Sequence, residues 1–261
     1  MSGQSSVLAA GGLPWPPSVD DFFLPGYFYP WITKFTVMVW IAAAVVMVFF
    51  LVSYRKPKLV PTKAQWIAES IYSFGRNGIS GDVIGHEGIK FAPYITTLLT
   101  FIGVMNVMAI VPFFQIAPTA HIGFPAALAL ISWVLYIWVG IRKHGVRRYF
   151  KNMTMPSGAP MWLMPLLIPL EFLSNFIVRP FTLAIRLFAN MFAGHFILLV
   201  FTLGGVVLLG SSTIAIKPIS VVSWAMDIVL TFLELLVALL QAYVFAILNA
   251  VYLQTSLTEE H

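Results

Sequence analysis

The sequence of 261 residues contains no cysteine and few charged residues. The absence of cysteine excludes a disulfide framework, a thiol nucleophile and a thiolate metal site. Only 10% of the residues are charged, whereas about a quarter are charged in a typical globular protein. Hydrophobic residues make up 59% of the chain, and its mean hydropathy is +0.89. This composition excludes an ordinary water-soluble protein and indicates an integral membrane protein.

Several catalytic motifs are also missing. The chain has no Gly-rich phosphate loop ending in Lys and Ser or Thr, and no Gly-x-Ser-x-Gly or His-Glu-x-x-His motif. We therefore expect no nucleotide chemistry by this chain itself and no intramembrane protease site. No internal repeat relates the two halves, which argues against a secondary transporter. The N-terminal region has no basic segment before an apolar run, which argues against a cleaved signal peptide.

The first long apolar segment, 35–54, contains no charged residue. A helix of this length spans about 30 Å, the thickness of the hydrocarbon core of a bilayer. Four basic residues follow it: Arg55, Lys56, Lys58 and Lys63. Because basic loops stay on the cytoplasmic side, we expect this end of the span in the cytoplasm. The tail of residues 1–34, rich in Gly, Pro and aromatic residues, is then extracytoplasmic and irregular.

Residues 62–80 are predicted to form an amphipathic helix. Thr62 and Gln65 have the spacing of an N-terminal capping box. Apolar residues then recur at helical intervals beside polar ones; the apolar set is Trp66, Ile67, Ile71 and Phe74, and the polar set is Gln65, Glu69 and Arg76. This pattern fits a helix lying on the membrane surface, and equally a helix packed against the protein.

Residues 91–141 are predicted to form a transmembrane hairpin of two uncharged segments, 91–111 and 123–141. The turn between them carries Pro112, Pro118 and Pro125. A second basic cluster follows, formed by Arg142, Lys143, Arg147, Arg148 and Lys151. This cluster returns the chain to the cytoplasmic side, in agreement with the first one.

The last hundred residues are predicted to form two long helices, 159–216 and 217–257, with a loop at Lys217 and Pro218. As one continuous helix, residues 159–206 would be about 70 Å long, far more than a perpendicular crossing needs. The first helix is therefore either strongly tilted or broken near Pro180.

Arg186 lies within this apolar region and is the residue that most needs an explanation. An arginine cannot release its proton to avoid the cost of burial, so it stays cationic in the membrane unless it reaches the headgroups. Arg179, beside Pro180, fits such a position in the headgroups better. A buried Arg186 needs an anionic counterpart, and we expect a partner subunit to supply it. Lipid phosphate or a small anionic substrate are the alternatives.

A second set of polar residues is predicted to connect the two long helices. Asp227, Glu234 and Gln241 are seven residues apart and share one face. His195 lies on nearly the opposite face to Arg186, with Asn190 on the Arg186 face. Packing the His195 face against the Glu234 stripe would form either a proton relay or a hydrogen-bonded pair that only joins two helices.

Two motifs in this region resemble a known family. The run RPFTLAIRLFANMFAGH at 179–195 resembles the signature of subunit a of the rotary F-type ATP synthases. Residues 234–252, with LLQAYVF around Gln241, are similar to the second conserved region of that family, and Glu259, Glu260 and His261 resemble the ending of many bacterial members. The resemblance extends over essentially the whole chain in its pattern of spans.

The resemblance implies a fold and a set of partners. The fold is an all-α membrane protein with an N-terminal span, a surface amphipathic helix, a short hairpin and two long tilted helices facing a rotor ring, the first continuing through Pro180. The implied partners are the c-subunit ring, b-type peripheral stalk subunits, the remaining complex and membrane lipid, with no nucleic acid, metal or cofactor. The implied location is the bacterial plasma membrane, with the N-terminus outside and the C-terminus in the cytoplasm.

The resemblance also implies roles for individual residues. The chain would be a non-catalytic stator subunit that provides two offset half-channels for protons. Arg186 matches the essential family arginine, accompanied by Asn190 and Gln241. His195 and Glu234 occupy the positions of an interacting pair, in the order found in mitochondrial relatives.

Two further acidic residues are weaker matches. Glu171 resembles the acidic residue of the cytoplasmic half-channel, but it stands one residue farther from Arg186 than in relatives, which requires a local bulge near Pro180. Asp227 is assigned to the outer half-channel only because it lies on the Glu234 stripe.

Overall fold

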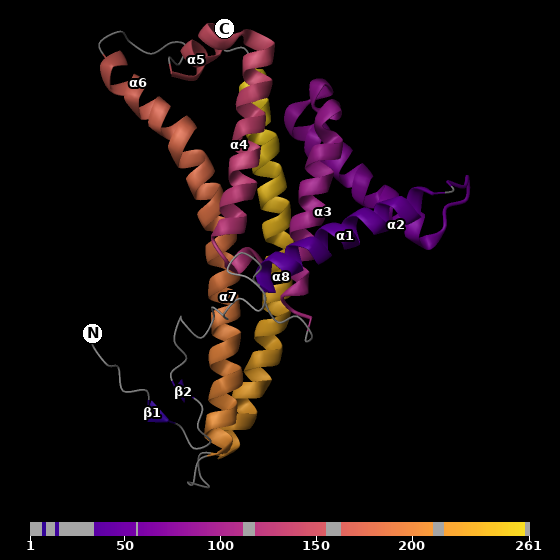
Figure 1. Ribbon diagram of the computed structural model, residues 1–261, viewed down its shortest axis with the longest axis vertical. Coiled ribbons are helices and arrows are strands. Elements are labelled where there is room, and N and C mark those ends of the chain that lie inside the picture. The colour runs from indigo at the N-terminus through magenta and orange to yellow at the C-terminus, as the bar shows by residue number, and fades with distance from the viewer. Residues whose placement is uncertain are drawn as a thin grey trace.

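The computed structural model describes residues 7–8, 14–15, 34–55, 57–111, 118–154, 163–210 and 217–258. Almost all of them are helical, and the long helices α7 and α8 run side by side along the length of the molecule (Figure 1). Within these ranges, five helical runs are long and apolar enough to cross a membrane: Phe35–Tyr54, His86–Met108, Gly123–His144, Met164–Leu209 and Lys217–Leu257. The predicted all-α membrane fold is confirmed.

Most of the predicted tail lies outside the described residues. Within it, the two-residue strands β1 (Val7–Leu8) and β2 (Pro14–Trp15) pair in antiparallel fashion.

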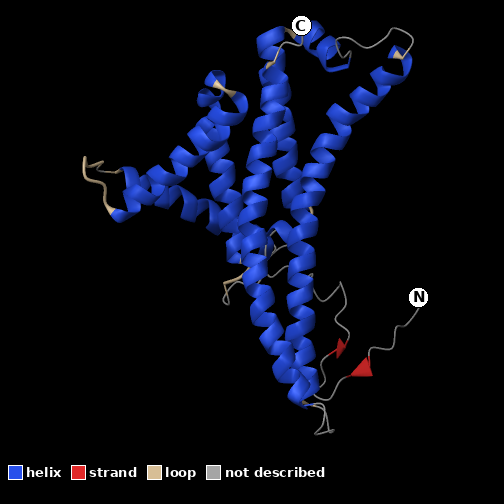
Figure 2. Ribbon diagram, turned by 180° about the vertical axis from the view of Figure 1, so that it is seen from behind, coloured by secondary structure: helices blue, strands red, loops and turns tan. Residues whose placement is uncertain are grey.

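The N-terminal helices form an arm that projects sideways from the long pair, as Figures 1 and 2 show from opposite sides. The arm consists of α1 (Lys34–Tyr54), α2 (Lys63–Ser73) and the π-helical segment η2 (Phe74–Ile84). Thr62 caps α2, because its hydroxyl accepts a hydrogen bond from the backbone N–H of Gln65 at 3.4 Å. The side chain of Gln65 does not complete the capping box and instead bonds to the backbone of Lys58.

Helix α2 combines features of both predicted positions. Gln65 and Ala68 are buried against the protein, whereas Trp66 is 62% exposed and Ile67 44% exposed. One side of the helix therefore packs on its neighbours, and two of its apolar side chains remain uncovered.

The central part of the chain forms a hairpin followed by a short helix. It contains η3 (His86–Phe91), α3 (Ala92–Met108), η4 (Pro118–Ala120), α4 (Gly123–His144) and α5 (Val146–Thr154). Gly145 has φ +79°, a left-handed conformation that suits glycine and turns the chain between α4 and α5. Helix α5 is then anchored by Tyr149, whose buried ring lies where a Cβ on Gly140 would be.

The first long helix is continuous but irregular. It comprises α6 (Met164–Leu173), the π-helical turn η5 (Ser174–Val178) and α7 (Arg179–Leu209), with no break at Pro180. Proline has no N–H, and its ring collides with the carbonyl four residues earlier. The π turn accommodates Pro180 at this point, because each carbonyl of a π turn pairs with the N–H five residues later and not with the one four residues later.

The second long helix, α8 (Lys217–Leu257), begins at Lys217. The loop predicted at Lys217 and Pro218 is therefore wrong, because proline fits the first turn of a helix, where no intrahelical donor is needed. A ridge of buried alanines, Ala238, Ala242, Ala246 and Ala250, faces the rest of the protein. Such small residues allow neighbouring helices to approach closely inside a membrane.

Candidate functional site

Helices α7 and α8 carry polar side chains at facing positions along their contact. Asn190 Nδ2 donates to Gln241 Oε1 at 2.7 Å. His195 Nδ1 lies 3.8 Å from Glu234 Oε1. Thr202 Oγ1 donates to Asp227 Oδ2 at 2.9 Å. As the residue number rises on α7 it falls on α8, so the three pairs share one antiparallel register; we call them the polar ladder.

The His195–Glu234 pair is the most buried ionisable part of the polar ladder. The Glu234 side chain is 5% exposed, and the His195 side chain is 12% exposed. Neither carboxylate oxygen of Glu234 accepts a hydrogen bond within the described ranges. A Cβ on Gly194 would lie 3.1 Å from Glu234 Oε1, so this glycine leaves space for the carboxyl group. Because an unpaired buried polar group is costly, His195 is the partner that the structure offers to Glu234.

Asn190 and Arg186, which were predicted to share a face, are one turn apart on α7 and both exposed. The amide of Asn190 also reaches α8, where it meets the buried Gln241. Two positions on α7 that are five residues apart, Asn190 and His195, therefore both reach α8. The contact face is wide enough for this because the two helices pack closely along their length.

Arg186 takes part in none of the three contacts of the polar ladder. Its side chain is exposed, as are those of its neighbours Phe181 and Ile185. Within the part of the chain that the structure describes, no carboxylate lies close enough to form an ion pair with Arg186. The cation thus lies on an open apolar face in the middle of the longest membrane-compatible run.

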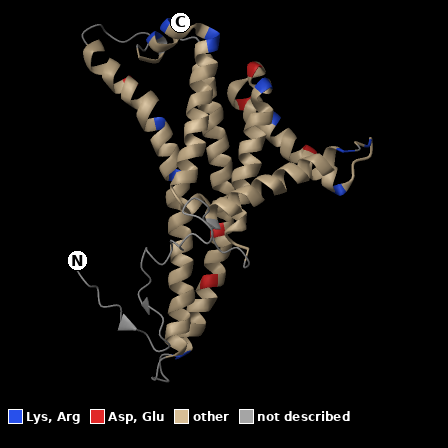
Figure 3. Cartoon of the chain, viewed as in Figure 1, with Lys and Arg blue, Asp and Glu red and all other residues tan. Residues whose placement is uncertain are grey.

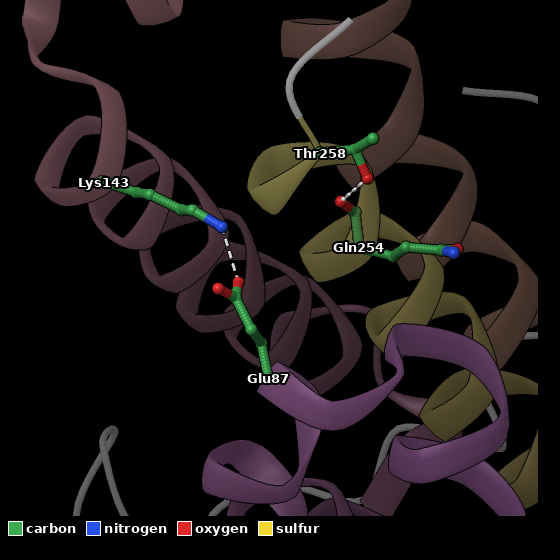
Figure 4. Close-up of polar contacts among 4 residues, drawn as sticks. All are labelled: Glu87, Lys143, Gln254 and Thr258. Carbon is green, nitrogen blue, oxygen red and sulfur yellow. Dashed lines mark hydrogen bonds and ion pairs between the residues drawn. The ribbon is translucent and has the colours of Figure 1, made fainter.

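A cavity of about 290 Å³ lies near the C-terminal end of α8. Three of its polar side chains come from the first long helix: Glu171, Asn175 and Arg179. The rest of the lining comes from α4, α5 and the end of α8: His144, Tyr149, Met153, Gln254, Thr255, Ser256 and Thr258. Figure 4 shows Gln254 and Thr258 beside the ion pair between Lys143 of α4 and Glu87 of η3. We call this space the polar pocket.

Arg179, for which the sequence favours a position in the headgroup region, lines the polar pocket. Its guanidinium carbon lies 5.3 Å from the ring centroid of Tyr252, a cation–π distance. Its Nη1 is buried and has no hydrogen-bond partner within the described residues. Burial raises the pKa of the Tyr149 hydroxyl, which also lines the pocket, so this group stays protonated at neutral pH.

The π turn η5 provides the bulge that the position of Glu171 requires. The N–H of Arg179 bonds to the carbonyl of Ser174, five residues earlier, so one extra residue is accommodated between Glu171 and Arg186. Asn175 Nδ2 donates to Glu171 Oε2 at 3.3 Å and to the Met153 carbonyl at 2.8 Å.

Pro180 also explains a contact that sequence reasoning missed. In the π turn, the natural donor to the Asn175 carbonyl is the N–H of residue 180, which proline lacks. The Tyr136 hydroxyl donates to this carbonyl instead, at 3.0 Å. A tyrosine in an apolar segment gives no signal of such a role before the helices are packed together.

A buried group at the hairpin was missed as well. Asn106 and Thr119 are both fully buried; Thr119 Oγ1 donates to Asn106 Oδ1 at 2.9 Å, and Asn106 Nδ2 donates to the Ala238 carbonyl at 3.2 Å. The one signal in the sequence is that Asn106 is an amide in an uncharged, mostly apolar segment, 91–111.

The charged residues are distributed unevenly along the molecule. Figure 3 shows Lys and Arg at the end that carries α5 and the C-terminus and also on the arm of α1, α2 and η2. The polar pocket lies at this basic end, since α5 and the end of α8 line it. Within the described ranges, no cluster of three His, Asp or Glu side chains could hold a metal ion.

A model of a protein family described as ATP synthase A chain matches residues 36–254. The chain belongs to this family. Within the ATP synthase A chain family, it is 41% identical over 259 residues to "ATP synthase subunit a" of Nocardioides sp., covering 94% of both chains. It is 45% identical over 240 residues to the protein of the same name from Parafrankia sp., covering 91% of this chain and 80% of the relative.

A third relative agrees with these two. The "ATP synthase subunit a" of Pseudarthrobacter chlorophenolicus is 40% identical over 248 residues, which is 93% of this chain and 92% of the relative. The resemblance to subunit a that the motifs at 179–195 and 234–252 suggest is thereby confirmed. The chain is thus a multi-pass membrane component of the ATP synthase family.

Proposed function

We propose that this chain is the proton-translocating stator subunit of an ATP synthase membrane sector. It would provide two offset half-channels that pass protons to and from carboxyl groups of a rotor. The observation that carries the proposal is the position of Arg186 between two separate polar regions of the first long helix. The polar pocket, with Glu171 and Arg179, precedes it, and the polar ladder, from Asn190 to Thr202, follows it.

The polar ladder would form the outer half-channel. Asp227 lies near the start of α8, far along the helix from the basic end, and its Oδ1 is buried without a hydrogen-bond partner within the described residues. A proton would pass from Asp227 to the His195–Glu234 pair, which is separated by 3.8 Å and leaves Glu234 without hydrogen bonds of its own. An imidazole and a carboxyl group in this arrangement can exchange a proton, directly or through one water molecule.

The polar pocket would form the cytoplasmic half-channel. It lies at the end that carries the second basic cluster, on α4 and α5, and basic clusters stay on the cytoplasmic side of bacterial membranes. Glu171 is the acidic group in this cavity, and Asn175 holds one of its oxygens. The same rule supports an extracytoplasmic N-terminus and a cytoplasmic C-terminus.

Arg186 would separate the two half-channels. A carboxyl group in lipid stays protonated, because burial disfavours its charged form. When such a group on a neighbouring rotor subunit reaches Arg186, the fixed positive charge stabilises the carboxylate and its proton leaves. The same charge repels a proton that moves directly from one half-channel to the other. Asn190 and Gln241, hydrogen-bonded beside it, would present amides to the same carboxylate.

This function implies partners that the chain must contact. The exposed face around Arg186 would meet the c-subunit ring, while b-type stalk subunits would hold the chain against rotation in the bacterial plasma membrane. The chain itself would carry out no ATP chemistry. A proton crossing 100 mV releases about 2.3 kcal/mol, so several protons are needed for each ATP made elsewhere in the complex.

The test is the substitution Arg186→Ala in the complete complex, reconstituted into vesicles. We expect ATP-driven proton pumping to be abolished while the complex still assembles. Arg76→Ala, which removes an exposed arginine of η2, is the matched control and should pump normally. Coupled pumping by the assembled Arg186→Ala complex at the rate of the control would refute the proposal.

A further inference from the structure

The hydrogen bonds of Asn106 and Thr119 join three separate parts of the chain. Asn106 lies on α3, Thr119 lies on η4, and the carbonyl that Asn106 reaches belongs to Ala238 of α8. All three residues are fully buried. We call the two side chains the Asn106–Thr119 clamp.

The clamp holds α8 at a specific place. Ala238 lies one turn after Glu234 and three residues before Gln241, so it stands between two rungs of the polar ladder. Ala238 also packs in one buried cluster with Met191, the residue that follows Asn190 on α7. The clamp therefore attaches to α8 where α8 meets the functional part of α7.

The two members of the clamp have different tasks. An amide side chain can rotate by half a turn and exchange its oxygen and nitrogen. The Thr119 hydroxyl donates to Asn106 Oδ1, which leaves Nδ2 directed at the Ala238 carbonyl. Without that hydroxyl, the amide can present its oxygen to the carbonyl, and two acceptors in a buried site repel each other.

We infer that Asn106 and Thr119 are positioning residues that fix the rotation and height of α8 against α7. This inference rests on the function proposed above, because its consequence is the alignment of Glu234 with His195 and of Gln241 with Asn190. A displacement of one residue moves a helical side chain by about 1.5 Å along the axis and about 100° around it. Either change separates both pairs.

The clamp acts on the His195–Glu234 pair through α8 and not by contact. Neither oxygen of Glu234 accepts a hydrogen bond within the described residues. The hydrogen bonds of Asn106 are likewise directed at Ala238 and Thr119. A loss of function on removing the clamp would therefore report the placement of α8.

The test compares Thr119→Val with Thr119→Ser in the complete complex reconstituted into vesicles. Valine keeps the shape of threonine and removes the donor, whereas serine keeps the donor. We expect ATP-driven pumping to fall roughly tenfold with Thr119→Val, equivalent to about 1.4 kcal/mol, and to stay close to the wild-type rate with Thr119→Ser. Thr100→Val is the control, since its hydroxyl bonds only to the backbone of its own helix.

A double-mutant cycle separates positioning from general destabilisation. If the clamp aligns the pair, Glu234→Gln should cost much less pumping in the Thr119→Val background than in the wild type, because the pair is already misaligned. Independent, multiplying losses would overturn the inference. Asn106→Leu provides a second variant that removes the bond to α8, and it should behave as Thr119→Val does.

The inference and the proposed function fail in distinguishable ways. Normal pumping by Arg186→Ala refutes the proposed function. An inactive Arg186→Ala complex together with wild-type pumping by Thr119→Val refutes the clamp alone. Failure of Thr119→Val and Asn106→Leu to assemble, while Thr119→Ser assembles, also overturns the positioning role and assigns the pair to folding.

Discussion

The two polar regions beside Arg186 are built in different ways. The polar ladder consists of side-chain pairs between two regular helices, at positions spaced seven apart on α8. The polar pocket surrounds an irregular turn, η5, and is enclosed by α4, α5 and the end of α8. The ladder therefore depends on helix register, and the pocket depends on tertiary packing around a proline.

This difference has a physical cause. A regular helix returns a side chain to the same face every seven residues, so a ladder can be encoded by spacing alone. A π turn adds one residue to the helix, so the side chains before the turn are rotated relative to those after it. Because of this rotation, Glu171 and Asn175 reach the same cavity as Arg179. The Asn175 carbonyl has no backbone donor in the turn, and the Tyr136 hydroxyl donates to it instead.

Among changes to the two polar regions themselves, the largest effect is expected from removing the ionisable rung of the ladder. His195→Ala combined with Glu234→Gln should lower proton flux by roughly 10²-fold, the lower range for loss of a positioned proton-transfer group. Assembly should be intact, because the substitutions remove charge and not helix packing. Flux through reconstituted complexes, measured with a pH-sensitive dye, tests this.

The control for that experiment is Thr231→Val, also on α8, whose hydroxyl bonds to the backbone of its own helix. It should leave flux unchanged. Equal flux in the double variant and in wild type would mean that the rung only joins two helices.

The packing that encloses the pocket can be broken at one glycine. A Cβ on Gly140 would overlap the ring of Tyr149, which is buried and anchors α5. We expect Gly140→Ala to destabilise the protein by about 1–3 kcal/mol, as overpacking does, and to displace α5 from the pocket. The midpoint of thermal unfolding of the purified complex measures this.

Gly103→Ala is the matched control on α3, because its Cβ would meet Ala242 at an ordinary 3.8 Å. It should be neutral or slightly stabilising, since alanine favours helices. Equal midpoints for the two variants would show that the Tyr149 contact does not anchor α5.

A smaller effect is expected at the π turn itself. Tyr136→Phe leaves the Asn175 carbonyl without a donor and should cost about 1–2 kcal/mol of stability. Pro180→Ala restores a backbone N–H at the position where the π turn needs it, so Tyr136→Phe should be nearly neutral in that background. The comparison requires unfolding midpoints of the single and double variants. Additive losses would disprove the link between Pro180 and Tyr136.

The sequence predicts the fold and the ladder more fully than the pocket. Long apolar segments define the spans, and the spacing of Asp227, Glu234 and Gln241 predicts one polar face, because these depend on local sequence. The hydrogen bond between Asn190 and Gln241 is not predicted by spacing, since a wide helix contact includes positions that a simple helical projection assigns to opposite sides.

The missed residues share one property. They act through contacts with backbone carbonyls of other segments or with one another, and the set is Tyr136, Asn175, Asn106 and Thr119. No spacing along the chain encodes such contacts. The position of Arg179 in the pocket likewise depends on a residue of another segment, Tyr252 of α8.

The smallest effect is expected at the ion pair between Glu87 and Lys143, which Figure 4 shows; Lys143 directly precedes His144, a residue of the pocket lining. Their side chains are 59% and 35% exposed, and exposed ion pairs contribute little because water and salt screen them. Glu87→Gln should therefore change neither the unfolding midpoint nor the pumping rate measurably, at low or at high salt. A clear loss confined to low salt would show that this pair, and not packing alone, holds the basic end of α4 beside the pocket.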